Sequence, residues 1–170
     1  GITLLATTRG IPQLYYGSEI GMAGDKGKGD ADIRQDFPGG WKGDANNAFT
    51  NSGRTEMQKQ FFDFTKKLLN WRKNKEVIHS GKLTHYIPEN NVYVYFRYLE
   101  PVKEMGQPAE VIMVVINNST KEQTLSWSRF AEGLHGFEKG KDVLNNQTFD
   151  FEQPSGTIPA KTSYIIKLHN

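Results

Sequence analysis

Residues 10–22 read GIPQLYYGSEIGM, and this stretch decides the fold. Apolar and aromatic side chains between Pro12 and Gly17 are typical of a short, fully buried strand, which we predict over residues 13–17. Just before it, residues 2–6 read ITLLA and fit the end of a helix. A helix end followed by a buried strand is an αβ unit, and such strands belong to parallel sheets covered by helices.

The next segment, residues 18–55, is rich in glycine and has little hydrophobic periodicity. A loop of this length is uncommon in a compact domain unless it is functional or disordered. Three aromatic residues within it, Phe37, Trp41 and Phe49, argue against simple disorder.

Residues 54–75 carry the clearest helical pattern, because large apolar residues recur there at spacings of three and four. Thr55 is a candidate N-cap, since Gln58 follows three residues later as in a capping box. Ser52 is the alternative N-cap.

From about residue 80 the hydrophobic period changes to two. Short apolar segments separated by turn residues predict an antiparallel β-sandwich. The predicted strands cover residues 92–97, 111–116, 124–127, 141–144, 148–151, 157–158 and 164–168. We therefore expect two parts, residues 1–77 and residues 78–170.

The composition excludes several functions. Lys and Arg total 21 against 19 Asp and Glu, for a net charge of +2, which argues against a nucleic-acid partner bound mainly through charge. The absence of cysteine excludes disulfides and cysteine-ligated metals. No apolar stretch approaches the length of a membrane span, so no membrane partner is expected.

The first block, residues 10–22, resembles the segment of the α-amylase family (glycoside hydrolase family 13) that carries the eighth barrel strand, written G-x-P-x-x-Y-Y-G-x-E. A second block, residues 33–44 (IRQDFPGGWKGD), is similar to the loop after that strand in cyclomaltodextrinase- and neopullulanase-like members. Helix 54–75 then matches the last barrel helix, and the tail resembles the family's C-terminal sandwich. The resemblance implies an α+β fragment: the last αβ segment of a (β/α)8 barrel, followed by an antiparallel all-β sandwich domain.

The resemblance also implies substrate contacts in the long loop, because barrel active sites lie at the C-terminal ends of the strands. In many members an Asp-x-x-x-Arg pair binds a remote glucose unit, and Asp30 with Arg34 has this spacing. Here Ala31 replaces the family's proline, and Asp32 competes for the role. The alternative is a solvated ion pair that contributes little.

Three aromatic residues, Trp41, Phe37 and Tyr16, are candidates for the substrate wall. Aromatic faces suit the apolar faces of pyranose rings. The alternative is that these side chains only pin the glycine-rich loop to the barrel rim.

Catalytic carboxylates are expected upstream of Gly1, since the family motifs that carry them are absent here. Glu19, Asp36 and Asp44 do not match those motifs. The parent is therefore expected to be a retaining glycoside hydrolase of α-glucans (starch, maltodextrin, pullulan or cyclodextrin). The chain alone would close and support the barrel without activity.

No metal site is expected in the chain, because its four histidines are scattered and residues 25–32 lack the calcium-loop spacing. The family allows calcium in a full-length enzyme, and no other cofactor is expected here. Family resemblance favours a bacterial periplasmic or extracellular location over the cytoplasm. A barrel strand without neighbours would leave its edges exposed, so residues 1–53 are predicted either to adopt a non-barrel arrangement or to be buried by self-association.

A freestanding carbohydrate-binding module is the alternative function. Aromatic residues of the sandwich could form its platform: Tyr86, Tyr93, Tyr95, Tyr98 and Trp127. Such a module would not need residues 1–75, which favours the hydrolase.

Overall fold

The computed structural model describes residues 1–100 and 110–170. They form two compact units, one of Gly1–Ile11 with Trp71–Asn170 and one of Pro12–Asn70. The first unit contains the strands and three short helices, which are α1 (Ile2–Thr7), α4 (Glu76–His79) and α5 (Ala131–Leu134). The second contains α2 (Asp30–Ile33) and most of α3 (Glu56–Arg72).

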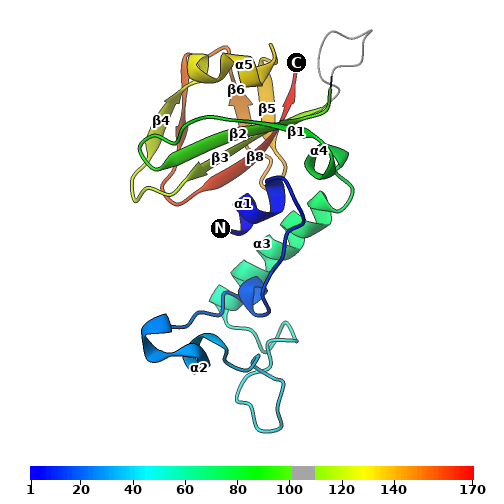
Figure 1. Cartoon of the computed structure of the whole chain (residues 1–170), viewed down its shortest axis with the longest axis vertical. Coiled ribbons are helices and arrows are strands. Elements are labelled where there is room, and N and C mark those ends of the chain that lie inside the picture. The colour runs from blue at the N-terminus through cyan, green and yellow to red at the C-terminus, as the bar shows by residue number, and fades with distance from the viewer. Residues whose placement is uncertain (101–109) are drawn as a thin grey trace. The chain divides into compact units, whose positions relative to one another are not determined.

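The first unit is an antiparallel β-sandwich (Figure 1). Its larger sheet has six strands in the order β1-β2-β3-β8-β5-β6, and a second sheet pairs β4 with β7. The strands are β1 (Lys82–His85), β2 (Val92–Tyr98), β3 (Val111–Asn117), β4 (Gln123–Ser126), β5 (Lys139–Asp142), β6 (Thr148–Asp150), β7 (Ser155–Ile158) and β8 (Ser163–His169). The predicted antiparallel sandwich is thus confirmed.

Residue alternation decides which side of the large sheet is the core. On β2, Val92, Val94 and Phe96 point into the main hydrophobic cluster. Their neighbours on β3 pair in register, as Val94 does with Val115 and Phe96 with Met113. The side chains between them point to the opposite face, because successive residues of a strand alternate.

One element of the core was not expected from the sequence. Residues predicted to end a strand at Trp127 instead turn into a 3-10 helix, Trp127–Phe130, followed directly by α5. Trp127 and Phe130 lie in the core, and Gly156 leaves room for the indole, because a Cβ there would come 2.0 Å from it. Figure 1 shows α5 on the opposite side of the large sheet from α1.

Helix α1 packs on the second face of the large sheet through polar contacts. The hydroxyls of Thr3 and Ser163 lie 2.8 Å apart, and those of Thr7 and Tyr95 lie 2.5 Å apart. Arg97, only 1% exposed, donates to the carbonyls of Thr7 (2.9 Å) and Gly81 (2.7 Å). Burial lowers the pKa of Arg97, but its partners are all carbonyl oxygens that suit the charged form.

Helix α3 begins with the predicted capping box. The backbone nitrogen of Gln58 donates to the Thr55 hydroxyl at 3.2 Å, and the Gln58 side-chain oxygen Oε1 accepts from the backbone nitrogen of Thr55 at 2.9 Å. The reciprocal pair satisfies two N–H groups that the first helical turn leaves without partners. Thr55, rather than Ser52, is therefore the N-terminal cap.

The strand predicted over residues 13–17 is not formed. Residues 13–16 have no regular structure, and a turn begins at Tyr16–Gly17. A buried parallel strand needs hydrogen-bonded neighbours on both sides. The paired strands of the described residues all belong to the sandwich, so Tyr15 and Tyr16 stay exposed.

Candidate functional site

All five residues predicted to contact substrate lie in the unit Pro12–Asn70. Asp30 begins α2, and its carboxylate accepts from Arg34 Nη2 at 3.1 Å, one turn later. Lys26 also pairs with Asp30. The side chains of Arg34 and Asp30 are 63% and 48% exposed, so the pair is solvated and open to a ligand.

Asp32, the competing carboxylate, has a different role. Its Oδ2 accepts from the backbone nitrogen of Asp25 at 2.5 Å. The Asp25 side chain in turn accepts from Gly27 N at 2.8 Å. Asp32 thus closes the loop in front of α2, which leaves Asp30 as the partner of Arg34.

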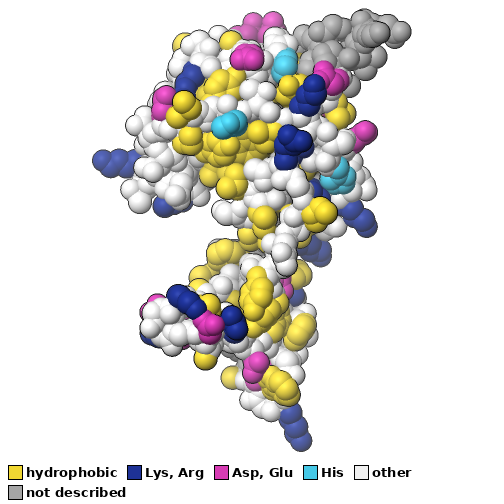
Figure 2. Space-filling view, viewed as in Figure 1, with side chains coloured by type: hydrophobic (Ala, Val, Ile, Leu, Met, Phe, Trp, Pro, Cys, Tyr) yellow, Lys and Arg dark blue, Asp and Glu magenta, His cyan; other side chains and the backbone are white. Residues whose placement is uncertain are grey.

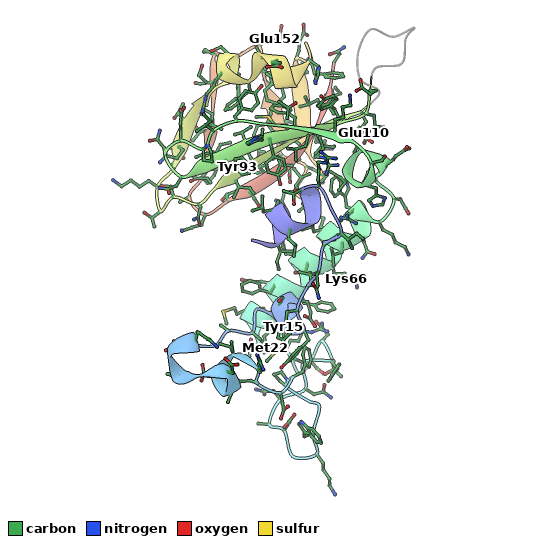
Figure 3. The ribbon with its side chains drawn as sticks, viewed as in Figure 1. Tyr15, Met22, Lys66, Tyr93, Glu110 and Glu152 are labelled. Atoms are coloured by element: carbon green, nitrogen blue, oxygen red, sulfur yellow. The ribbon has the colours of Figure 1, made fainter. Side chains whose placement is uncertain are left out.

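Tyr16 lies beside a small cavity of about 70 Å³ lined by Tyr15, Met22 and Ile33, among others. Figure 3 shows Tyr15 and Met22 side by side there. The Tyr16 hydroxyl donates to the Gln35 carbonyl at 2.8 Å. Loss of surrounding water, then the neighbouring Tyr15, raises the pKa of Tyr16, so the hydroxyl remains a donor. The cavity has room for several water molecules.

Trp41 lies within a tight turn over residues 39–44 and is 67% exposed. One carboxylate oxygen of Asp44 accepts from the backbone nitrogens of Gly39 (2.7 Å) and Trp41 (3.2 Å). The Asp44 nitrogen donates back to the Trp41 carbonyl at 3.2 Å. Gly39 has a φ of 98° and packs against Asn47, so a side chain there would be strained and would clash.

Phe37 has a different environment from Trp41. Its ring is half-buried and contacts that of Phe49, with centroids 4.5 Å apart. The backbone nitrogen of Ala48 donates to the Pro38 carbonyl at 2.9 Å, which joins the two ends of the turn. Phe37 therefore packs within the loop.

Arg54 connects this loop to α3. Its Nε donates to the Ala48 carbonyl at 2.8 Å, and its guanidinium lies over the Phe62 ring at 3.5 Å from the centroid. Sequence reasoning did not identify Arg54 or the bonds of Asp44. The sequence carries one signal for Asp44, which lies in a glycine-rich segment three residues after Trp41. In such segments an aspartate side chain often closes a turn by accepting from backbone N–H groups.

The sandwich exposes fewer aromatic side chains than the predicted sugar-binding platform requires. Trp127 is 3% exposed and Tyr95 is fully buried, so neither presents a face to solvent. Tyr86 packs against Phe96 and Phe130 in the core. For Trp127 and Tyr95 the platform prediction is wrong, because both are needed to fill the two faces of the large sheet.

Tyr93 lies on the same face of the large sheet as Tyr95 but is only half-buried, and its ring meets His85 with centroids 6.2 Å apart. Figure 3 shows Tyr93 over the large sheet, and Figure 2 shows hydrophobic side chains gathered on the same face of the sandwich. A single half-buried tyrosine is a small surface for a sugar chain.

Across residues 1–100 and 110–170, no group of three or more His, Cys, Asp or Glu side chains is arranged to hold a metal ion. Nor does any helix in these ranges have the length and apolar character needed to cross a membrane.

Known proteins resemble this chain along most of its length. A cyclomaltodextrinase from Thermoanaerobacter pseudethanolicus is 27% identical over 158 residues, covering 93% of this chain and 22% of its own length. An amylopullulanase from Thermoanaerobacterium saccharolyticum is 28% identical over 165 residues, covering 92% of this chain and 11% of its own. The chain thus spans less than a quarter of these relatives.

Solved structures share the fold. The α-amylase of Geobacillus thermoleovorans, solved in complex with acarbose, aligns with a TM-score of 0.69 and 22% identity over 99% of this chain and 32% of its own. The trehalose-6-phosphate hydrolase of Bacillus licheniformis aligns with a TM-score of 0.68 and 19% identity over 99% and 38%.

The family profile of cyclomaltodextrinase C-terminal domains matches residues 83–167, which is half of the chain and the greater part of the sandwich. With the strand order and the relatives above, this match decides the family. The chain belongs to the cyclomaltodextrinase C-terminal domain family, whose members are parts of α-amylase-family glycoside hydrolases.

Proposed function

We propose that this chain is the C-terminal part of a retaining glycoside hydrolase that acts on α-glucans such as starch, maltodextrin, pullulan or cyclodextrin. In this proposal residues 1–77 complete the catalytic (β/α)8 barrel, and residues 78–170 form the sandwich that supports it. The carboxylates that cleave the glycosidic bond would be supplied by a preceding part of the same polypeptide.

The exposed apolar side chains of the unit Pro12–Asn70 carry this proposal. Seven large ones are at least one-third exposed: Tyr15, Tyr16, Ile33, Trp41, Phe49, Met57 and Phe61. Figure 2 shows hydrophobic side chains on the viewed face of this unit. A soluble domain rarely leaves so much apolar surface without a partner. Preceding barrel strands and helices would cover much of it, and the likeness to solved α-amylases extends over this unit.

Within the barrel, the loop after residue 17 would lie at the rim where barrel enzymes bind substrate. Asp30 and Arg34 would hold the hydroxyls of a glucose unit remote from the cleaved bond, and Trp41 would stack on a sugar ring. Tyr16 and Phe37 would shape the rim from within the loop, consistent with their contacts to Gln35 and Phe49.

The chemistry of glycoside cleavage supports placing the catalytic carboxylates in a preceding part of the polypeptide. A retaining glycosidase needs a nucleophile and an acid/base about 5–5.5 Å apart. In this chain Asp44 is engaged by two backbone N–H groups and acts in local structure, while Asp30 is paired with two cations at the proposed glucose contact. The chain alone is therefore expected to be inactive.

The experiment compares this chain with a longer product of its gene that includes the preceding segment. Both are incubated with soluble starch, pullulan and β-cyclodextrin, and released reducing ends are measured. The longer product is expected to release sugar and the chain alone none. Hydrolysis by the chain alone, or none by a folded longer product, would overturn the proposal.

A further inference from the structure

Trp41 differs from the other tryptophans of the chain. The sequence has three, and of these Trp71 is half-buried and Trp127 is in the core. Trp41 is 67% exposed within the turn 39–44, which has no second large apolar side chain. An exposed indole held in an ordered turn has no packing role there that would explain it.

The turn is closed by one side chain. Asp44 Oδ2 accepts from Gly39 N at 2.7 Å and from Trp41 N at 3.2 Å. Because a carboxylate is charged, these bonds are stronger than bonds to a neutral acceptor. They fix the backbone on both sides of Gly40, and with it the point from which the indole projects.

The base of the turn is also fixed. Ala48 N donates to the Pro38 carbonyl at 2.9 Å, and the Phe37 and Phe49 rings lie in contact. Arg54 ties Ala48 to α3 through its bond of 2.8 Å and its position over Phe62. Trp41 is therefore carried on an ordered support that begins in a 17-residue helix.

We infer that Asp44 is a positioning residue that presents the face of Trp41 to one glucose ring of an α-glucan. The inference rests on the proposed function, since it assigns the substrate contact to Trp41. Ordering the ring in advance lowers the entropy lost on binding, which is how a weak stacking contact becomes useful.

The size of the exposed surface selects a sugar ring over a protein partner. One tryptophan side chain buries on the order of 200 Å². Stable protein interfaces bury about 1,200 Å² or more in total, which the turn 39–44 cannot supply by itself because Trp41 is its one large apolar side chain. The flat face of one pyranose ring matches the area of the indole.

The test uses the whole chain labelled with 5-fluorotryptophan, which gives three ¹⁹F resonances. The Trp41 resonance is identified by its loss in Trp41→Phe. Maltoheptaose is titrated to millimolar concentration while the shift and line width of each resonance are recorded. Asp44→Asn and Asp44→Ala are compared with Asp36→Asn, a matched control in the same loop whose exposed carboxylate does not close the turn.

In the wild-type chain, maltoheptaose is expected to shift the Trp41 resonance and leave those of Trp71 and Trp127 unchanged. Without sugar, the Trp41 line should narrow in Asp44→Asn and narrow further in Asp44→Ala, because the indole becomes more mobile. Affinity should fall about threefold in Asp44→Asn and about tenfold in Asp44→Ala, in line with the loss of charge assistance and then of both bonds. Asp36→Asn should behave as wild type.

Two results separate the possible failures. An unchanged Trp41 line width in Asp44→Ala, with or without sugar binding, would overturn the positioning role of Asp44. A wild-type Trp41 resonance that does not respond to maltoheptaose would instead overturn the substrate contact in the proposed function, and the line widths without sugar would still decide the role of Asp44 in ordering the indole.

Discussion

Arg97 joins α1 and the turn before β1 to the face of the large sheet opposite the core. It comes from the middle of β2 and donates to carbonyls of α1 and of the turn before β1. Buried carbonyls without donors are costly, and so is a buried charge without acceptors. The sequence gives no sign of this role, because Arg97 falls at a strand position where an exposed polar residue is equally expected.

Arg97→Met is therefore expected to lower the free energy of unfolding by about 2–4 kcal/mol. Methionine fills a similar volume, but it leaves the Thr7 and Gly81 carbonyls without their donor. Urea denaturation followed by fluorescence measures the change. Arg9→Lys, at an exposed position, is the control and should cost little. A cost for Arg97→Met no larger than that of Arg9→Lys would show that α1 is held by other contacts.

Tyr95 gives the sandwich a dependence on pH. Burial raises the pKa of its hydroxyl well above the ordinary value. The folded chain therefore retains a proton that the unfolded chain loses above about pH 10. The contribution of Tyr95 to the free energy of unfolding is fully present below that pH. It should fall as pH rises further, by up to about 1.4 kcal/mol per pH unit.

Urea denaturation from about pH 9 to about pH 11 measures this slope. Tyr95→Phe should reduce the slope, although it lowers stability at neutral pH through loss of the bond to Thr7. Thr7→Val removes the same bond but leaves Tyr95 able to ionise, so it should keep the slope. Equal slopes in wild type and Tyr95→Phe would contradict the assignment.

At the scale of elements, α3 illustrates what local sequence can specify. Its capping box was predictable because the two residues that form it are three apart and need no tertiary partner. The strands of the sandwich were predictable for a similar reason, since alternation along β2 and β3 is visible in the sequence.

Thr55→Ala should destabilise the start of α3 by about 1 kcal/mol. The Gln58 amide, which loses its acceptor, should then exchange its hydrogen about fivefold faster, since 1.4 kcal/mol corresponds to a factor of ten. Hydrogen exchange read by NMR measures this. Ser52→Ala is the matched control, because the structure makes Thr55 the cap. Faster Gln58 exchange in Ser52→Ala instead would reverse that assignment.

Other elements could not be predicted because they depend on distant residues. The segment 13–17 has the composition of a buried strand, but a strand forms only where neighbours provide hydrogen bonds. Trp127 was predicted to end a strand, but it begins a 3-10 helix, in which its indole packs against Gly156 in the space that a side chain would otherwise fill. In the candidate site, the Asp30–Arg34 pair followed from spacing, whereas the contacts of Arg54 with Ala48 and Phe62 depend on how the loop folds back.

At the scale of the whole molecule, apolar surface governs behaviour in solution. The unit Pro12–Asn70 exposes Met57 and Phe61 on α3 together with Tyr15 and Trp41. Exposed apolar surface of this extent promotes association. We expect the isolated chain to self-associate as its concentration rises.

Light scattering coupled to size exclusion measures this association. Met57→Gln with Phe61→Ser should shift the chain toward monomer, because both side chains are exposed and their loss removes apolar area without opening the core. Lys66→Gln, at an exposed position further along α3, is the control and should leave association unchanged. A strict monomer at all concentrations, with residues 1–20 protected from hydrogen exchange, would contradict the prediction.

The contact between Thr3 and Ser163 joins residues 160 positions apart. During synthesis α1 leaves the ribosome well before β8, on which it rests. At typical translation rates this delay is on the order of ten seconds. For that time the Thr3 hydroxyl must bond to water or to other groups, because Ser163 has not yet been made. Strand β8 therefore completes the surroundings of a helix that was made 160 residues earlier.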